Sequence, residues 1–294
     1  MSDRYAVIAA HRAEFPVRLM CRMLDVSATG FYAAQRRPPS RHAQHDVQLQ
    51  QVITTTFARC RSAYGSPRIK RELRQAGHCV SEKRVARLMR HAGLSARARR
   101  RFVCTTDSRH AFPIAPNLVQ RDFTIHRPLN TTWASDTTYL PTDEGWLYLA
   151  VVLDVASRRV VGWATSAQND TSLVLSALQR ALALRTPPCG LVQHSDRGST
   201  YASVAYQAVL REHGVISSMS RAGDCWDNAV AESFFATLEW ELFGNGPFAT
   251  RASTHRALID YIDTWYNRER MHSTLHYRSP IQHEQYLLCT PQAA

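Results

Sequence analysis

Two kinds of hydrophobic pattern divide the chain. In the front third, stretches such as residues 17–24 and 67–76 place apolar side chains three or four positions apart, which predicts amphipathic helices. From residue 131 the pattern changes to short runs of β-branched and aromatic residues, which are typical of strands. The sequence therefore predicts a helical front followed by a part that contains a sheet.

The first helical unit has the spacing of a helix-turn-helix. Residues 17–24 and 28–35 predict two short helices joined by a turn, with Ser27 as the N-cap of the second. Such a pair docks its second helix in the major groove of DNA, where Arg36 and Arg37 would reach phosphates. A small helical hairpin without a role in DNA binding fits the same residues.

A second helix-turn-helix is predicted between Pro67 and Gly93, with Ser81 as the cap of its second helix. The buried stripe of that helix is formed by Val85, Leu88 and Met89. Its polar face and the stretch that follows carry the basic residues Lys83, Arg84, Arg87, Arg90, Arg97, Arg99, Arg100 and Arg101. These residues meet almost no acidic neighbours in the sequence, which favours contact with DNA over an ordinary solvated face.

The later part of the chain predicts an α/β fold. Strands are expected at residues 132–140, 146–154, 159–165, 191–195 and 215–218, and helices at 171–184, 203–213 and 227–242. This order predicts a mixed sheet with flanking helices, as in the ribonuclease-H-like architecture. A dinucleotide-binding fold is not supported, because the sequence contains no GxGxxG motif.

Changes in pattern and composition predict where the domains begin and end. A stretch rich in proline, threonine and serine follows the second helical unit and reads as a linker. We expect an N-terminal helix-turn-helix at residues 1–50, a second DNA-binding helical unit at 51–103 and the linker at 104–126. The catalytic core is expected at 127–245 and a C-terminal helical part of that core at 246–294.

The charge of the chain is concentrated at its front. The 294 residues carry a formal net charge of +12, but residues 1–126 contain 23 basic and 8 acidic residues, whereas residues 127–294 contain 13 and 16. Such asymmetry indicates that the front binds a polyanion, and double-stranded DNA is the expected partner.

Cysteine usage and hydropathy indicate the compartment. The seven cysteines are scattered without a CxxC pair, which argues against a disulfide framework or a zinc site. No apolar run approaches 18 residues, and the N-terminus lacks the pattern of a signal peptide. We expect a cytoplasmic protein without a membrane segment.

Three carboxylates fall at special places in the predicted sheet. Asp136 lies in the first strand, Asp196 directly after the fourth, and Glu232 about one turn into the last helix. An acid inside an apolar strand is unfavourable unless it is paired, solvated or bound to a metal. Converging carboxylates need a cation, and hard oxygen ligands select Mg²⁺ or Mn²⁺. Two such ions would support cleavage or transfer of a phosphodiester.

The surroundings of these acids carry a family resemblance. The segments 133–139, 194–201 and 227–235 resemble the three catalytic signatures of bacterial insertion-sequence transposases with a retroviral-integrase-type core. The 35 residues between Asp196 and Glu232 match the interval of the D,D-35-E group, and residues 266–275 resemble a tail that these proteins share. The resemblance covers nearly the whole chain and is closest to the OrfB-type subunit.

The resemblance implies an activity and partners. It implies that Asp136, Asp196 and Glu232 bind the metals, that the protein acts on transposon ends and target DNA as a homo-oligomer at the nucleoid, and that an upstream-frame OrfA-type subunit joins it. Many relatives have Lys or Arg seven residues after the glutamate, where this chain has Glu239. An exposed helix acid is the simpler interpretation of Glu239, and Arg197, Arg221 or Arg268 would replace the missing DNA contact.

Three further polar residues have weaker indications. His194 would position water or a phosphate, although a packed histidine at a strand end fits equally well. Asn228 lies one turn before Glu232 and would bond near the metals. Asp154 closes the second strand, where an ion pair with Arg158 explains it without a catalytic role.

These observations favour a DNA transposase that binds terminal inverted repeats and performs metal-dependent end cleavage and strand transfer. The first alternative is a DNA-binding regulator that uses the helical front and has a catalytically silent core, but a silent core gains nothing from three converging carboxylates. The second is a ribonuclease, which helix-turn-helix units do not suit, since they fit the major groove of B-form DNA.

Overall fold

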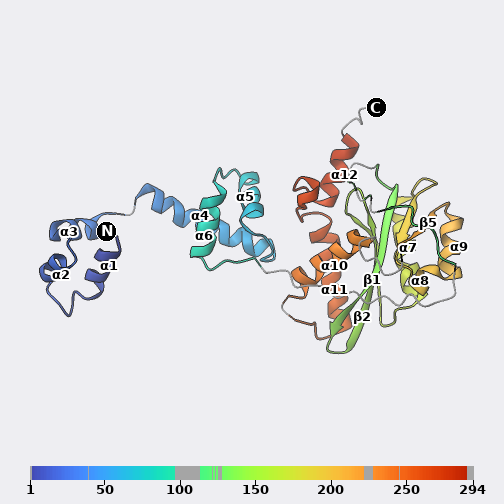
Figure 1. Cartoon of the computed structure of the whole chain (residues 1–294), viewed down its shortest axis with the longest axis horizontal. Coiled ribbons are helices and arrows are strands. Elements are labelled where there is room, and N and C mark those ends of the chain that lie inside the picture. Colours follow the sequence, from blue (N-terminus) through green and yellow to red (C-terminus); the bar gives the residue numbers. More distant parts are fainter. Residues whose placement is uncertain are drawn as a thin grey trace.

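The computed structural model describes most of the chain. The described residues are 2–38, 40–96, 113–120, 122, 124, 128–221, 228–244 and 246–289. Figure 1 shows two helical parts followed in the chain by a larger part built on a sheet. In the ranges that are described, no helix is both long and apolar enough to cross a membrane.

The first helical part consists of α1 (Ser2–Ala10), α2 (Val17–Met23) and α3 (Ala28–Arg36). Ile8, Cys21 and Phe31, one from each helix, form its small apolar core. The Oγ of Ser27 accepts a hydrogen bond from the backbone N–H of Gly30 and so caps α3. The predicted pair of helices with its cap is confirmed, whereas the sequence did not predict α1.

The second helical part consists of α4 (Arg41–Arg59), α5 (Ser66–Gln75) and α6 (Glu82–His91). The helices α5 and α6 are the predicted second pair, and the Oγ of Ser81 accepts the backbone N–H of Arg84 as the expected cap. The predicted stripe of Val85, Leu88 and Met89 is buried. The sequence did not predict α4, which is continuous through residues 50 and 51, where a domain boundary was expected.

Two basic residues of α6 have an acidic partner on α4. Asp46 accepts hydrogen bonds of 2.7 Å from Arg84 Nε and 2.7 Å from Arg87 Nη2. Burial alone would raise the pKa of Asp46, but the hydrogen bonds and charges of the two arginines lower it. The expectation that these residues lack acidic neighbours was therefore wrong for Arg84 and Arg87, because α4 brings Asp46 beside them from 38 and 41 residues away. Lys83 and Arg90 are exposed.

Five strands form one mixed sheet. They are β1 (Thr132–Thr142), β2 (Gly145–Asp154), β3 (Val160–Ser166), β4 (Val192–Ser195) and β5 (Ile216–Met219). Their order is β3-β2-β1-β4-β5, with an antiparallel meander from β1 to β3 and parallel pairing of β4 with both β1 and β5. The predicted order of strands and helices and the ribonuclease-H-like α/β architecture are confirmed.

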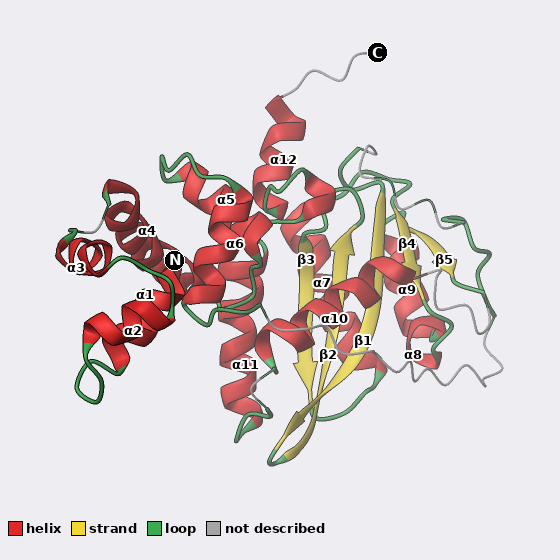
Figure 2. Ribbon diagram, turned by 60° about the vertical axis from the view of Figure 1, so that its left-hand side comes forward, coloured by secondary structure: helices red, strands yellow, loops and turns green. Residues whose placement is uncertain are grey.

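Helices cover both faces of the sheet (Figure 2). One face packs against α7 (Thr171–Arg185), α8 (Ser199–Ala202) and α9 (Val204–Glu212). Trp133 and Val152 belong to this layer and are buried. At Gly162 of β3 the helix α7 is so close that a Cβ atom would lie 2.2 Å from the backbone oxygen of Ala177. Only glycine fits this approach.

The opposite face packs against α10 (Ala229–Leu242) and the π-helix η2 (Asp260–Tyr266). The π-helix continues α11 (Arg251–Ile259) and buries four large side chains, Tyr261, Ile262, Trp265 and Tyr266. A short 3-10 helix η3 (Ser273–Leu275) and α12 (Pro280–Cys289) follow. The carboxylate of Glu284 on α12 accepts hydrogen bonds from Ser157, Arg159 and Arg185, which holds α12 against the turn between β2 and β3.

The second helical part and the sheet share one apolar cluster. Tyr64, between α4 and α5, is fully buried, and its hydroxyl accepts a 2.7 Å hydrogen bond from the backbone N–H of Met271. Arg61 forms an ion pair with Asp260 at the start of η2. These contacts fix α4–α6 against the C-terminal part of the chain.

Part of the predicted linker also lies against the sheet. The backbone N–H of Leu118 donates a 2.9 Å hydrogen bond to Ser218 Oγ, and Met219 N–H donates one of 3.4 Å to the carbonyl oxygen of Pro116. Val119 is buried. The segment 113–120 is therefore packed along β5. Four residues of the predicted basic track, Arg97, Arg99, Arg100 and Arg101, lie outside the described residues.

Candidate active site

Asp136 lies in the middle of β1, half-buried and opposite Val151 of β2. Its Oδ1 accepts a 2.8 Å hydrogen bond from the backbone N–H of Thr137. Because side chains alternate along a strand, Asp136 lies on the same face of the sheet as Ala134. Ala134 belongs to the apolar cluster that also contains residues of α10. The carboxylate therefore lies on the α10 side of the sheet.

Asp196 follows the last residue of β4. This strand runs parallel to β1 with His194 opposite Ala134, so Asp196 leaves the sheet beside Asp136. Its Oδ1 accepts a 2.9 Å hydrogen bond from the backbone N–H of Gly198. A Cβ atom at position 198 would lie 3.0 Å from the same oxygen, so glycine there leaves room for the carboxylate in this turn.

Glu232 lies half-buried in the first turn of α10, where the helix dipole favours a carboxylate. The helix is anchored by Asn228, a buried residue directly before it. The side-chain amide of Asn228 donates a 3.1 Å hydrogen bond to the backbone oxygen of Ser135, the neighbour of Asp136. This bond ties the start of α10 to the strand that carries the first acid.

The charges of the other two acids act on Asp136. Burial raises the pKa of Asp136 well above its usual range, and the charges of Asp196 and Glu232 raise it further, while the Thr137 N–H works in the opposite direction. Burial also raises the pKa of Glu232. Residues 136, 196 and 232, which are predicted from three separate segments, therefore lie near enough for the charges of Asp196 and Glu232 to act on Asp136.

The donor chemistry of this cluster fits a divalent cation. Carboxylate oxygens are the ligands that Mg²⁺ and Mn²⁺ prefer, and a cation would relieve the repulsion that raises the pKa of Asp136. In the part of the chain that the structure describes, no three His, Cys, Asp or Glu side chains are close enough together to hold one metal ion.

Tyr201 is a polar neighbour of the cluster that sequence reasoning missed. Its buried hydroxyl makes no hydrogen bond to a described residue. Burial raises the pKa of Tyr201, and the charges of Asp136, Tyr206 and Asp196 raise it further. The available signal was its place in the segment 194–201, five residues after Asp196.

His194 and Asp154 have structural hydrogen bonds. His194 is fully buried in β4, and its Nδ1 lies 2.9 Å from Ser218 Oγ, which agrees with the alternative of a packed strand-end histidine. Asp154 is fully buried and accepts hydrogen bonds from the backbone N–H groups of Asn130, at 2.7 Å, and Ser157, at 2.9 Å. The carboxylate of Asp154 thus holds the turn after β2.

The predicted DNA contacts differ in their surroundings. Arg36 lies at the exposed C-terminal end of α3, and Arg37 follows it. Arg197 is half-buried, and its Nε donates a hydrogen bond to the backbone oxygen of Ser220. Glu239 is exposed on α10, as the simpler interpretation expected.

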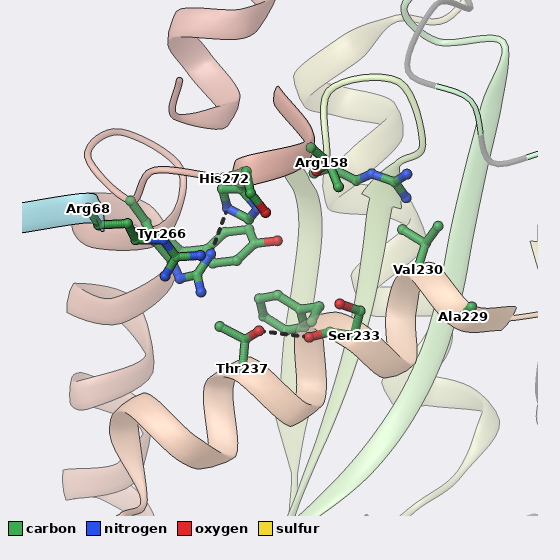
Figure 3. Close-up of a pocket in the computed structure, with 12 residues that line it drawn as sticks. Arg68, Arg158, Ala229, Val230, Ser233, Thr237, Tyr266 and His272 are labelled. Carbon is green, nitrogen blue, oxygen red and sulfur yellow. Dashed lines mark hydrogen bonds between the residues drawn. The ribbon is translucent and has the colours of Figure 1, made fainter. Parts of the chain in front are cut away.

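A cavity of about 270 Å³ lies beside α10, the helix that carries Glu232. It is lined by the basic residues Arg68, Arg158, Arg270 and His272 together with residues of α10, and we call it the basic cavity (Figure 3). Sequence reasoning did not find it, although Arg270 and His272 belong to the segment 266–275 that carried part of the resemblance.

Three parts of the chain match known families. Residues 126–225 match a family described as "Integrase core domain", and residues 232–288 match a second family of the same description. Residues 44–102 match a family described as "HTH-like domain".

Curated relatives match along nearly the full length. The chain is 42% identical over 283 residues to "Transposase InsF for insertion sequence IS3A" of Escherichia coli (strain K12), which covers 96% of this chain and 98% of the relative. It is 39% identical over 261 residues to "Insertion element IS600 uncharacterized 31 kDa protein" of Shigella sonnei, which covers 89% of this chain and 96% of the relative.

The solved structures that match the chain include a viral intasome and an integrase catalytic core domain. A simian T-cell lymphotropic virus intasome in complex with PP2A regulatory subunit B56 gamma is 17% identical, with a TM-score of 0.45 over 76% of this chain and 75% of that chain. The trimeric form of the HTLV-2 integrase catalytic core domain in complex with magnesium is 17% identical, with a TM-score of 0.41 over 53% of this chain and 96% of that chain.

Proposed function

The chain belongs to the family of insertion-sequence transposases that includes InsF of IS3, and from this premise we propose that Asp136, Asp196 and Glu232 perform metal-dependent cleavage and joining of DNA ends. Membership makes the chain a DNA transposase of the DDE type with an HTH-like domain for DNA. The substrates that we propose are the terminal inverted repeats of the element and a target DNA.

The observation that supports the proposal is that the charges of Asp196 and Glu232, which come from separate elements, both act on Asp136. The pKa of Asp136 is raised by burial and by both other acids. Burial and repulsion of carboxylates destabilise a fold, so an arrangement of this kind favours a functional role for the acids. Two Mg²⁺ or Mn²⁺ ions held by these residues would activate a water or a 3′-hydroxyl and stabilise the leaving oxygen.

The chain's own groups orient the acids. Backbone N–H groups of Thr137 and Gly198 each bond one carboxylate oxygen, which fixes how Asp136 and Asp196 face the substrate. Asn228 sets the position of α10 relative to β1 through its bond to the backbone of Ser135. These bonds support a preorganised site, and His194 would support it indirectly through its bond in β4.

DNA binding is proposed for the helical front. Exposure favours Arg36, Arg37, Lys83 and Arg90 as phosphate contacts, whereas Arg84 and Arg87 serve first as partners of Asp46. The basic residues at 97 and 99–101 and Arg197 complete the proposed set. We retain the expected domains at 1–50, 51–103, 104–126, 127–245 and 246–294 as part of the proposal, with the first boundary falling inside α4.

The proposal includes an assembly. Two DNA ends must be held together for joining, which a homo-oligomer achieves by supplying one active site to each end. An upstream-frame OrfA-type subunit would add a further DNA contact. The compartment that we propose is the cytoplasm at the nucleoid, because the DNA substrate lies there.

Cleavage of a labelled duplex containing an element end tests the function. With Mg²⁺ the wild-type chain should nick the end and join it to target DNA, and Asp196→Asn should reduce both reactions by more than about a thousandfold with DNA affinity nearly unchanged. The exposed acid Glu212 provides a control, since Glu212→Gln should leave both reactions intact. Binding without nicking by the wild type would favour a regulator, and cleavage of RNA alone a ribonuclease.

A further inference from the structure

The basic cavity is built from parts of the chain that lie far apart in sequence. Arg68 comes from α5, Arg158 from the turn between β2 and β3, and Arg270 from the segment after η2. In Figure 3, Arg68 approaches from one side of the cavity, Arg158 lies across it, and Ser233 and Thr237 rise from α10 below. The cavity therefore joins the HTH-like part to the part that carries the acids.

Each of the three guanidinium groups has a defined position. The Cζ of Arg68 lies 5.2 Å from the ring centroid of Tyr64. The Nε of Arg270 donates to both carboxylate oxygens of Glu241, at 2.8 and 2.9 Å, in a fully buried pair. Arg158 has a left-handed backbone with φ of 61°, an uncommon conformation that such residues adopt only when their surroundings enforce it.

The lining of the cavity is basic. None of the described residues that line it is acidic. Behind the lining, Glu241 pairs with Arg270 and its charge also acts on Arg68. The charge of Asp154 acts on Arg158. A lining that presents basic groups and no carboxylate favours an anion, and solvent screens this attraction less in partly buried surroundings than at an open surface.

The arginines of the cavity also affect the protonation of His272, which lines it. Burial lowers the pKa of His272 well below its usual range, and the charges of Arg270, Arg68 and Arg158 lower it further. The ring is therefore neutral at pH 7, and its Nε2 accepts a 3.2 Å hydrogen bond from Arg270 Nη1. The positive potential comes from arginines, whose planar groups match phosphate oxygens.

The rim of the cavity adds hydrogen-bond donors and includes the residue that follows Glu232. Ser233, Ser273 and Thr274 are exposed and line the opening with hydroxyl groups, which are common donors to phosphate oxygens. Ser233 follows Glu232 directly on α10, so the cavity and this acid use the same part of the helix.

We propose that the basic cavity binds one backbone phosphate of the DNA strand whose neighbouring phosphate lies at Asp136, Asp196 and Glu232. This inference deepens the proposed function and rests on it. Arg68 and Arg158 hold the phosphate, and the bound strand bridges α5 and α10. These contacts hold the bound DNA in a fixed position relative to the HTH-like part and the acids.

The test compares two arginines of α5 in the full-length chain. Arg68→Gln removes a guanidinium from the cavity, and Arg74→Gln removes one from an exposed position on the same helix outside it. DNA affinity is titrated over a range of salt concentrations without divalent metal, using a duplex with an element end. Arg68→Gln should lower the slope of log affinity against log salt by about 0.9, the value for one lost phosphate contact, while Arg74→Gln changes it much less.

A second variant keeps the test independent of the fold. Arg158→Asn removes the other guanidinium and places at this position a residue that tolerates a left-handed backbone. Melting curves identify variants that unfold, and the slope is read only from variants that melt like the wild type. Combining Arg68→Gln with Arg158→Asn should change the slope by less than the sum of the single changes, because both hold the same phosphate. Wild-type slopes in both single variants would overturn the proposal.

Inorganic phosphate distinguishes a DNA phosphate from a free ion. If addition of phosphate at constant ionic strength raises the melting temperature of the wild type and not of Arg68→Gln, while the DNA slopes are equal, the cavity takes a free phosphate and the proposal is wrong. The binding readout needs no catalysis. If the wild type fails to nick DNA while Arg68→Gln still lowers the salt slope, the proposed reaction is contradicted and the proposed phosphate site is supported.

Discussion

The side-chain amide of Asn228 donates a 3.1 Å hydrogen bond to the backbone oxygen of Ser135, so the helix that carries Glu232 is anchored one residue away from Asp136. We expect Asn228→Ala to lower the rate of DNA nicking about 10- to 100-fold, as loss of an orienting partner does in metal sites. The measurement is a single-turnover nicking rate at saturating Mg²⁺. Asn117→Ala, which removes an amide from the segment along β5, is the control and should leave the rate unchanged. An unaffected rate in Asn228→Ala would show that α10 keeps its position without this bond.

The raised pKa of Asp136 predicts how stability changes with pH. Because the folded-state pKa lies above the unfolded value of 3.8, this carboxyl contributes stability that is complete below that value and is lost as the pH rises through the folded pKa. Asp136→Asn should therefore melt at a higher temperature than the wild type at pH 7 without metal, and the difference should vanish toward pH 3.8. Melting curves across this range check the sign. A variant that is less stable at pH 7 would contradict the electrostatic account.

Divalent metal should reverse that difference. If Asp136, Asp196 and Glu232 hold Mg²⁺ or Mn²⁺, adding the ion at about a hundred times its dissociation constant should stabilise the wild type by about 2.7 kcal/mol, and chelation should remove the gain. Asp196→Asn and Glu232→Gln should show little stabilisation. NaCl at the same ionic strength serves as the comparison for general ionic effects. Equal stabilisation of all three chains would place the metal elsewhere.

The pairs on Asp46 separate structural arginines from those that contact DNA. Arg84→Gln should lower the melting temperature, because it removes a partner from Asp46, whereas Lys83→Gln and Arg90→Gln on the exposed side should leave it unchanged. In salt titrations the two exposed variants should each lower the slope by about 0.9. If Arg84→Gln alone lowers the slope, then α6 presents a different face to DNA from the one that its exposure indicates.

Glu239 provides a gain-of-function test. It is exposed on α10, seven residues or about 10 Å along the helix from Glu232, where a lysine would face the same strand of DNA. Glu239→Lys should tighten binding of the element end and raise the salt slope by about 0.9, with the metal dependence unchanged. Glu212→Lys makes the same change in charge on α9. Equal tightening by both variants would mean that the effect arises from net charge and not from this position.

Local signals predicted most of the sheet part. Strand and helix patterns have short periods, so the element that carries each acid is readable from a few residues, and the caps Ser27 and Ser81 were likewise visible. The family resemblance then added the roles of the acids. The sequence did not predict α1 or the π-helix after α11, which depend on packing with other elements.

Long-range pairs escaped prediction for a physical reason. The partnership of Asp46 with Arg84 crosses 38 residues, and the basic cavity gathers Arg68, Arg158 and Arg270 from three elements. No periodicity encodes which helix faces meet, because that depends on how apolar surfaces pack in three dimensions. Net charge along the sequence therefore overestimated how many basic residues of α6 are without acidic partners.

The buried hydroxyl of Tyr64 and the backbone of Met271 join the HTH-like part to the sheet within one apolar cluster. In a protein built in this way, the distance between the DNA-binding helices and the acids is constant. On the proposed function, the base pairs that the helices grip and the phosphate that the acids attack are separated by a fixed length of rigid protein. One base pair inserted between them moves the phosphate by about 3.4 Å and turns it by roughly a tenth of a helical turn. The DNA sequence of the element must then keep this spacing constant. A single inserted base pair would prevent cleavage and joining at an end even though every base that the protein contacts is unchanged.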